Sequence, residues 1–207
     1  MKWRSLIRFI AASALTAAIA RPAGAQIIVG KGKTGPVPNP VTLDTTGMFQ
    51  AKFVSVGDDM FIGGQPTEKA LRELKAKGVT TVVNLRMPEE MARVGFDEAA
   101  LVNELGMKYV HIPMRGGNGE MSYSPATLAR FTSAMKSADG KVLLHCTIAW
   151  RASHIWAAYL IQEGVPEADA LQHARGINLM DEHRMDDSGQ QPVEMFLGRR
   201  LSSIKRP

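Results

Sequence analysis

One short segment carries the residues best suited to chemistry, namely Cys146 and Arg151 in KVLLHCTIAWRASHIWAAYL. The pattern predicts an apolar strand over 141–145, a loop that begins at Cys146, and a helix that follows at once from Arg151. Free backbone N–H groups of such a loop and of the first helical turn point into one concavity, which the helix dipole and the guanidinium make positive. A tetrahedral anion fits there, and a thiol at its mouth is expected to ionise to a nucleophilic thiolate.

Cysteine and histidine usage narrows the possible chemistry. Cys146 is the only cysteine among the 207 residues, so no internal disulfide can form. The alternative is a small buried apolar side chain, which the nearby Arg151 makes less attractive. The histidines lack paired metal-ligand spacing; they are His111, His145, His154, His173 and His183. We therefore expect no metal and no cofactor, and we expect His173 and His183 on exposed surfaces.

The elements that must position this segment alternate along the chain from residue 49 onward. Strands are predicted over 51–56, 60–62, 79–85, 107–113 and 141–145. Helices are predicted over 66–78, 97–106, 124–137 and 151–163, with two more that open at Pro166 and Pro192. Apolar, β-branched strands that alternate with helices are typical of the α/β class. We predict an α/β fold with a central, mainly parallel sheet of four to five strands flanked by helices.

The first 25 residues have the pattern of an export signal. The basic residues Lys2, Arg4 and Arg8 precede a mainly apolar run over 9–20, and Ala23-Gly24-Ala25 is an A-x-A cleavage pattern. The run is short for a membrane anchor, which needs about 20 residues. We expect cleavage near Ala25 and a periplasmic or secreted protein.

The division of the rest of the chain follows from composition. Residues 26–47 are rich in glycine and proline and predict an N-terminal arm or linker, and 48–207 predict one domain with C-terminal helices. The formal net charge is +5, but beyond residue 25 the chain has 21 basic against 20 acidic side chains. A nearly neutral domain has no general field for polyanions, so we expect no nucleic-acid partner. No later segment predicts a membrane span.

Three motifs in order resemble those of a known superfamily. The order FIGGQPTEKALRELKAKGVTTVVNLR, YVHIP and VLLHC-x4-R resembles the dual-specificity/tyrosine-phosphatase-like superfamily over about residues 53–163. It is most similar to the bacterial branch whose phosphatase-like domain also occurs in β-lactamase-hydrolase-like proteins. Its most specific elements are Gly64-Gln65-Pro66, Asn84-Leu85-Arg86 and His145-Cys146 with Arg151. The resemblance implies a cysteine-phosphatase-like fold. It also implies an enzyme that hydrolyses phosphomonoesters through a cysteinyl-phosphate, with phosphorylated proteins or small phosphomonoesters as substrates.

The same resemblance implies roles for individual residues. Cys146 would be the nucleophile, Arg151 the phosphate clamp, and His145 would orient the loop and tune the thiolate. The cradle around the phosphate would be Thr147, Ile148, Ala149 and Trp150, with Ala149 where the branch usually has a glycine in left-handed conformation.

The general acid is less well defined. The superfamily places an Asp in the loop after residue 113, whereas 114–123 contains Glu120 as its only carboxylate. Glu120 is therefore the candidate acid, and Glu89 and Glu90 are possible substitutes.

Two other functions stay open. Rhodanese-type sulfurtransferases also use a cysteine-started loop with four residues before a basic or polar residue, so Cys146 would then carry a persulfide; VVNLRMPEE resembles a segment near their site. A catalytically weak pseudophosphatase would instead bind an anionic partner through the same loop.

Overall fold

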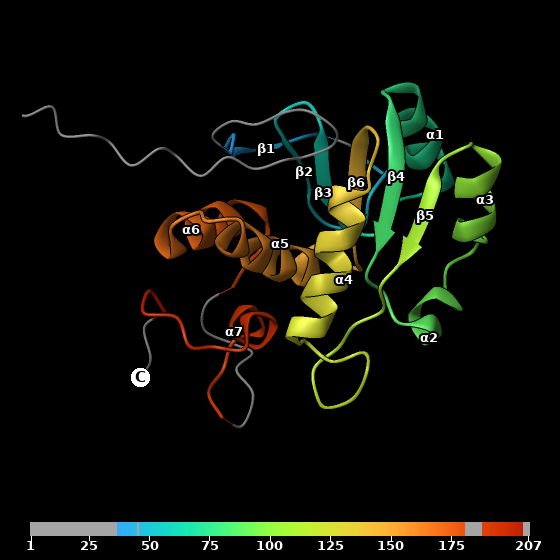
Figure 1. Cartoon of the computed structure of the whole chain (residues 1–207). Coiled ribbons are helices and arrows are strands. Elements are labelled where there is room, and N and C mark those ends of the chain that lie inside the picture. Colours follow the sequence, from blue (N-terminus) through green and yellow to red (C-terminus); the bar gives the residue numbers. More distant parts are fainter. Residues whose placement is uncertain (1–36, 45, 181–187, 205–207) are drawn as a thin grey trace, which may run out of the picture.

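The computed structural model describes residues 37–44, 46–180 and 188–204 of the chain (Figure 1). The expected signal peptide and the first part of the expected arm lie outside the described residues, as does His183. Within the described residues, no helix combines the length and hydropathy that crossing a membrane requires.

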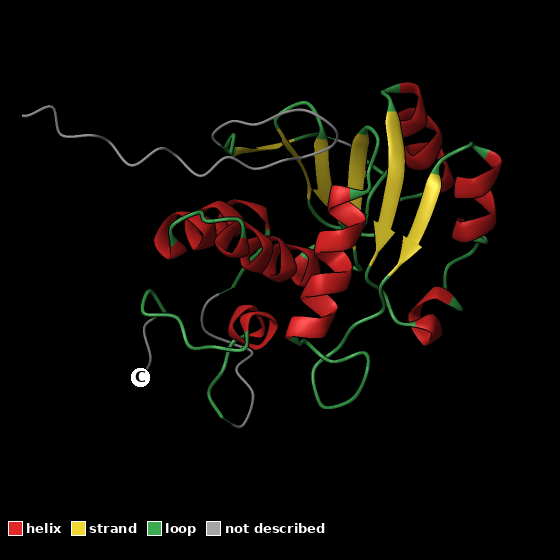
Figure 2. Ribbon diagram, viewed as in Figure 1, coloured by secondary structure: helices red, strands yellow, loops and turns green. Residues whose placement is uncertain are grey.

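A mainly parallel sheet runs through the described chain, with the strand order β1-β2-β3-β6-β4-β5 (Figures 1 and 2). The strands are β1 (Pro40–Thr42), β2 (Phe53–Val56), β3 (Met60–Gly63), β4 (Val79–Asn84), β5 (Lys108–His111) and β6 (Lys141–His145). The last four in spatial order are parallel, and β1 and β2 are antiparallel. The predicted fold class is confirmed, but the sheet has six strands, because residues 40–42 of the expected arm pair with β2.

Helices cover both faces of this sheet (Figure 2). The described helices are α1 (Glu68–Ala76), α2 (Pro88–Met91), α3 (Glu98–Glu104), α4 (Pro125–Lys136), α5 (Trp150–Gln162), α6 (Glu167–Ile177) and α7 (Pro192–Leu197). α1 and α3 pack on one face, while α4 to α7 share the hydrophobic core of the other. Three predicted helix starts are capped by side-chain oxygens that accept a backbone N–H: Thr67, Asp97 and Ser124.

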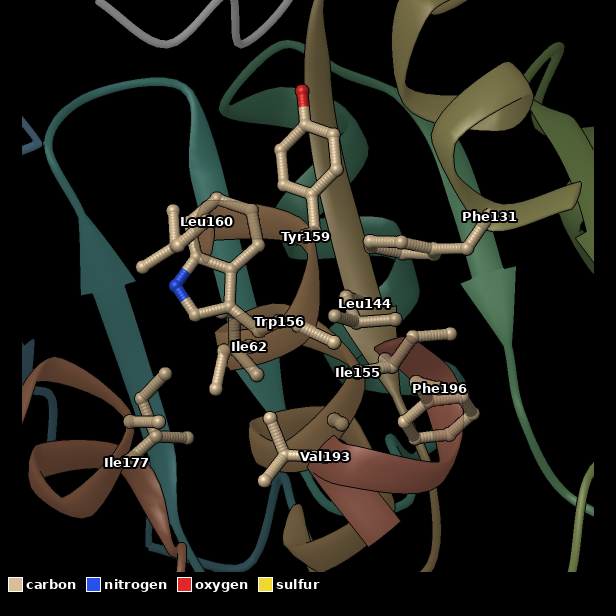
Figure 3. Packing of buried hydrophobic residues seen from close by; sticks show 14 of the residues in the cluster. Ile62, Phe131, Leu144, Ile155, Trp156, Tyr159, Leu160, Ile177, Val193 and Phe196 are labelled. Carbon is tan, nitrogen blue, oxygen red and sulfur yellow. The ribbon is translucent and has the colours of Figure 1, made fainter. Parts of the chain in front are cut away.

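α5 is the central helix of the larger core. Trp156 and Tyr159 lie against the sheet, and the Tyr159 ring meets Phe131 of α4 edge to face at 5.6 Å (Figure 3). Because α6 packs on α5, His173 is buried at 8% exposure, and the expectation that it lies on an exposed surface is wrong. Its Nδ1 accepts from Trp156 Nε1 at 3.3 Å and its Nε2 donates to the Pro38 carbonyl at 2.8 Å.

The parallel register brings three sequence motifs to one edge of the sheet. His145 at the end of β6 is paired with Gly63 of β3 on one side and Asn84 of β4 on the other. The segments that follow these three residues therefore leave the sheet side by side. This edge holds the candidate site.

Candidate active site

The loop between β6 and α5 has the conformation that an anion cradle needs. Ala149 is the residue before the helix, and its φ of 66° and ψ of 0° are left-handed, as the resemblance implies. A non-glycine residue pays roughly 1–2 kcal/mol for this conformation. Such a turn allows loop amides and the first turn of a following helix to face the same concavity. The loop is tied to β3, because Gln65 donates its N–H to the Thr147 carbonyl at 3.0 Å.

Gly64 is required by a close approach of backbone. A Cβ at this position would lie 1.5 Å from the carbonyl oxygen of Gln50 and 2.8 Å from that of Thr147. Any side chain would therefore displace the Gln50 backbone first and also crowd the Cys146 loop at Thr147. This explains the glycine of the Gly64-Gln65-Pro66 motif.

The loop borders a pocket of about 380 Å³. Its lining is Met87, Glu89, Glu90, Arg115, Tyr123, Cys146, Thr147, Ile148, Trp150 and Arg151. Five of the expected site residues line this cavity, namely Cys146, Thr147, Ile148, Trp150 and Arg151. Ala149 and His145 are adjacent to them in the chain but are not part of the lining. Cys146 itself is only 1% exposed.

The candidate acid from sequence reasoning lies elsewhere. Glu120 is exposed on the 114–123 loop and is not part of the pocket lining. The described carboxylates that do line the pocket are Glu89 and Glu90. Sequence reasoning also assigned no role to Arg115 and Tyr123, which the 114–123 loop brings to the pocket.

Glu90 forms a bidentate ion pair with Arg151, the expected phosphate-binding cation of the pocket. Arg151 donates from Nη1 to Glu90 Oε2 at 2.7 Å and from Nη2 to Oε1 at 2.6 Å. Thr147 donates its hydroxyl to Glu90 Oε1 at 2.8 Å and accepts from Arg151 Nη2 at 3.0 Å. Burial raises the pKa of Glu90, but the hydrogen bonds from Arg151, the Met87 amide and Thr147 outweigh it and bring the pKa to about 2. Glu90 is therefore ionised.

Glu89 occupies the mouth of the pocket. Its Oε1 accepts from Arg115 Nη1 at 3.1 Å, and the two side chains are 56% and 66% exposed. Such an exposed pair is weak and opens readily. Glu89 is thus the pocket carboxylate that is open to solvent and to a bound molecule.

A buried polar network supports the loop from below. Glu98 of α3 is 1% exposed, and its carboxylate contacts His145 Nε2 at 3.0 Å and Asn84 Nδ2 at 2.9 Å, while Gln65 donates to its other oxygen. Burial raises the pKa of Glu98, but the charge and hydrogen bond of His145 together with the other donors outweigh it, so the pKa is lowered. Sequence reasoning missed Glu98, because a glutamate in the first turn of a helix usually reads as solvated.

Arg86 links this network to Glu90. Its Nη1 donates to Gln65 Oε1 at 2.6 Å and its Nη2 to the carbonyl of Glu90 at 3.1 Å. Burial is the largest influence on Arg86 and lowers its pKa. The Asn84-Leu85-Arg86 motif thereby fixes the start of α2, the helix that carries both pocket glutamates. Among the described residues, no cluster of His, Cys, Asp and Glu is arranged to hold a metal ion.

Comparison with known proteins agrees with this arrangement. The family model for the "Beta-lactamase hydrolase-like protein, phosphatase-like domain" matches residues 52–163. A β-lactamase hydrolase-like protein of Xylella fastidiosa (strain Temecula1 / ATCC 700964) is 30% identical over 133 residues, which make up 62% of this chain. The aligned part is 30% of the relative, so the chain spans under a third of the length of the curated relatives it matches.

Solved structures share the fold. TpbA of P. aeruginosa, solved in complex with pTyr, is 17% identical with a TM-score of 0.55, over 77% of this chain and 94% of that one. PTPMT1 is 18% identical with a TM-score of 0.51, over 67% of this chain and 87% of that one. The family match covers more than half of the chain, from β2 to the end of α5. The chain therefore belongs to the family of the phosphatase-like domain of β-lactamase hydrolase-like proteins, and the expected phosphatase-like enzyme class is confirmed.

Proposed function

We propose that the protein hydrolyses phosphate monoesters through a cysteinyl-phosphate on Cys146. One observation carries this proposal: the Cys146 sulfur lies in the same small pocket as the Arg151 guanidinium, at the amino-terminal end of α5. Membership of a phosphatase-like family supports the reaction class. The match to a phosphatase-like family weighs against a sulfurtransferase.

In the first step, the thiolate of Cys146 attacks the phosphorus atom. A P–S bond forms, the P–O bond to the alcohol breaks, and its electron pair goes to the leaving oxygen, which takes up one proton. The loop amides of 147–150 and Arg151 stabilise the charge on the three other oxygens. Arg151 Nε donates to none of the described residues, so this edge of the guanidinium remains for an oxyanion.

In the second step, water attacks the same phosphorus atom. The P–S bond breaks, the thiolate is regenerated, and inorganic phosphate leaves. Glu89 is positioned to transfer a proton in both steps, because it lines the pocket mouth and is exposed. Glu90 is unsuited as a proton donor, since its pKa of about 2 keeps it ionised at neutral pH. The aromatic side chains of Tyr123 and Trp150 in the lining support aryl phosphates of the phosphotyrosine type as substrates.

The test is release of p-nitrophenol from p-nitrophenyl phosphate by the purified protein between pH 5 and 7. We expect turnover by the wild type, none by Cys146→Ser, and competitive inhibition by vanadate. Arg151→Lys keeps the charge but loses the planar fork, and we expect at least a tenfold fall in kcat/KM. Rapid quenching should trap one phosphate per chain on Cys146.

Other outcomes would identify the alternatives. Cys146-dependent formation of thiocyanate from thiosulfate and cyanide, without phosphatase turnover, would make the protein a sulfurtransferase. Binding of phosphate or vanadate with no turnover of any aryl phosphate would make it a pseudophosphatase.

Export is a separate part of the proposal. The pattern of residues 1–25 supports cleavage near Ala25 and a periplasmic or secreted location. Fractionation of cells that express the full chain should place it outside the cytoplasm, with Gln26 as the first residue found by N-terminal sequencing. Recovery of the uncleaved chain in the cytoplasm would contradict this.

A further inference from the structure

A second, larger cavity lies next to the candidate active-site pocket. This groove has a volume of about 760 Å³ and lies between the turn before β2, the start of α1 and the segment that joins α2 to α3. Its lining is Gly47, Phe49, Gln50, Gln65, Pro66, Thr67, Glu68, Lys69, Arg86, Arg93, Val94, Gly95, Phe96 and Thr147. Both cavities have the size of small-molecule sites, which is roughly 300–1,000 Å³.

The two cavities share one described lining residue. Thr147 lines both of them and is half-buried. Beside it, Arg86 lines the groove and donates to the carbonyl of Glu90, which lines the pocket. A molecule with a phosphoryl group against Cys146 would reach the groove across Thr147, the residue that the two cavities share.

The groove carries an excess of positive charge. Lys69, Arg86 and Arg93 line it, and Glu68 is the one carboxylate among its described lining residues. Arg93 is exposed and forms no ion pair or side-chain hydrogen bond with the described residues, while Lys69 has one long contact of 3.8 Å to Glu73. The two exposed cations are thus available to a ligand.

Arg86 adds a fixed charge to the groove. It is 7% exposed, and its buried Nε lies 3.9 Å from Glu90 Oε1 but has no hydrogen-bond partner, which is uncommon for a buried donor. The half-buried rings of Phe49 and Phe96 supply the apolar part of the lining. Cations beside an apolar wall favour an organic anion over an uncharged ligand.

We propose that this groove is a second anion subsite, so that among small alkyl phosphomonoesters the site prefers those whose alcohol part carries a second anionic group, such as a sugar or polyol bisphosphate. The proposal rests on the phosphatase function above. The scissile phosphate occupies the Cys146 pocket, and the second anion lies across Thr147 against Arg93 and Lys69.

The test compares matched substrates that differ only in the second anion. We expect kcat/KM for fructose 1,6-bisphosphate to exceed that for fructose 6-phosphate in the wild type. The double variant Arg93→Gln/Lys69→Gln should lower the value for the bisphosphate about five- to tenfold, as expected for two exposed charge pairs, and leave p-nitrophenyl phosphate within about twofold. Glu68→Gln should have the opposite effect and raise the value for the bisphosphate.

Arg72→Gln is the matched control. Arg72 lies on α1, as Lys69 does. It is also exposed and pairs with Glu104 at 3.6 Å, outside the groove. Arg72→Gln removes one positive charge, as each of the two groove substitutions does, and should leave both sugar phosphates unchanged, whereas Lys69→Gln alone should lower the value for the bisphosphate. An equal loss in Arg72→Gln would mean a general charge effect and would overturn the subsite.

A binding experiment tests this inference separately from the proposed function. Calorimetric titration of fructose 1,6-bisphosphate into Cys146→Ser should show a Kd that the Arg93→Gln/Lys69→Gln changes raise about five- to tenfold. Lack of turnover of every aryl phosphate would overturn the phosphatase function, whereas this titration would still decide the subsite. Equal affinity in both backgrounds would overturn the subsite.

Discussion

The carboxylate of Glu90 holds both terminal nitrogens of Arg151, with Nη1 at 2.7 Å from Oε2 and Nη2 at 2.6 Å from Oε1. The two residues are 61 positions apart and come from α2 and α5. A bidentate pair fixes the plane of the guanidinium as well as its position. The orientation of the proposed phosphate clamp is therefore set by a different element from the loop that carries Cys146.

Replacement of Glu90 should disturb this orientation. Glu90→Gln keeps the size of the side chain but offers one acceptor oxygen where two are used, and its amide faces the Arg151 donors. We expect kcat/KM for p-nitrophenyl phosphate to fall about tenfold, since misplacement of a binding group is costly in catalysis. Unchanged or higher activity would instead identify the Glu90 carboxylate as a competitor of the substrate.

The same pair predicts an acid-sensitive contribution to stability. Because the pKa of Glu90 is about 2 when folded and its ordinary value is 4.5, its contribution is complete above about pH 4.5 and is lost as the pH falls toward 2. After allowance for its partial exposure, it is worth about 1 kcal/mol. Urea unfolding of wild type and Glu90→Gln should differ at pH 7 and converge near pH 2. A difference that is independent of pH would contradict this origin.

Glu89 is expected to matter most for poor leaving groups. An alkoxide needs a proton as it leaves, whereas p-nitrophenolate does not, and general acid catalysis typically contributes about 10²–10⁴-fold. Glu89→Gln should therefore reduce hydrolysis of an alkyl phosphate at least tenfold more than that of p-nitrophenyl phosphate. Glu120→Gln, outside the pocket, is the control and should change neither. The reverse result would restore Glu120 as the acid.

Gly64 should tolerate no side chain. Its Cβ would meet the Gln50 and Thr147 carbonyls, so Gly64→Ala is expected to destabilise the fold by about 3 kcal/mol or more and to displace the Cys146 loop. Gly95→Ala has open space around the new methyl group and ordinary backbone geometry. Its unfolding free energy should stay within about 0.5 kcal/mol of wild type. Similar losses in both variants would argue against the close approach.

His173 makes the fold sensitive to mild acid. Burial lowers its pKa below 6.5, outweighing the Pro38 hydrogen bond, so below about pH 6.5 the unfolded chain takes up a proton that the folded protein resists. Stability should therefore fall as the pH is lowered from 7.5 to 5.5. Thermal unfolding followed by tryptophan fluorescence should show this slope in wild type, and His173→Gln should flatten it. An unaltered slope in the variant would assign the effect to another group.

Local patterns in the sequence predicted much of the fold. The β-branched run of β4 and the capping residues Thr67, Asp97 and Ser124 place their elements correctly, because periodicity and capping depend on neighbours within a few residues. The spacing of Cys146 and Arg151 across a strand, a loop and a helix also implied the concavity. Even the left-handed turn at Ala149 was expected from the resemblance.

Other features were decided by the tertiary structure. The antiparallel pairing of β1, the burial of Glu98 beneath His145, the grip of Glu90 on Arg151 and the groove across Thr147 all join residues far apart in the chain. Which side chains meet there depends on β6 lying between β3 and β4, an order that no local signal specifies. The sequence by itself therefore determined the elements and the Cys146 loop, whereas the presence of Glu89 and Glu90 rather than Glu120 in the pocket lining followed only from the packing of the strands.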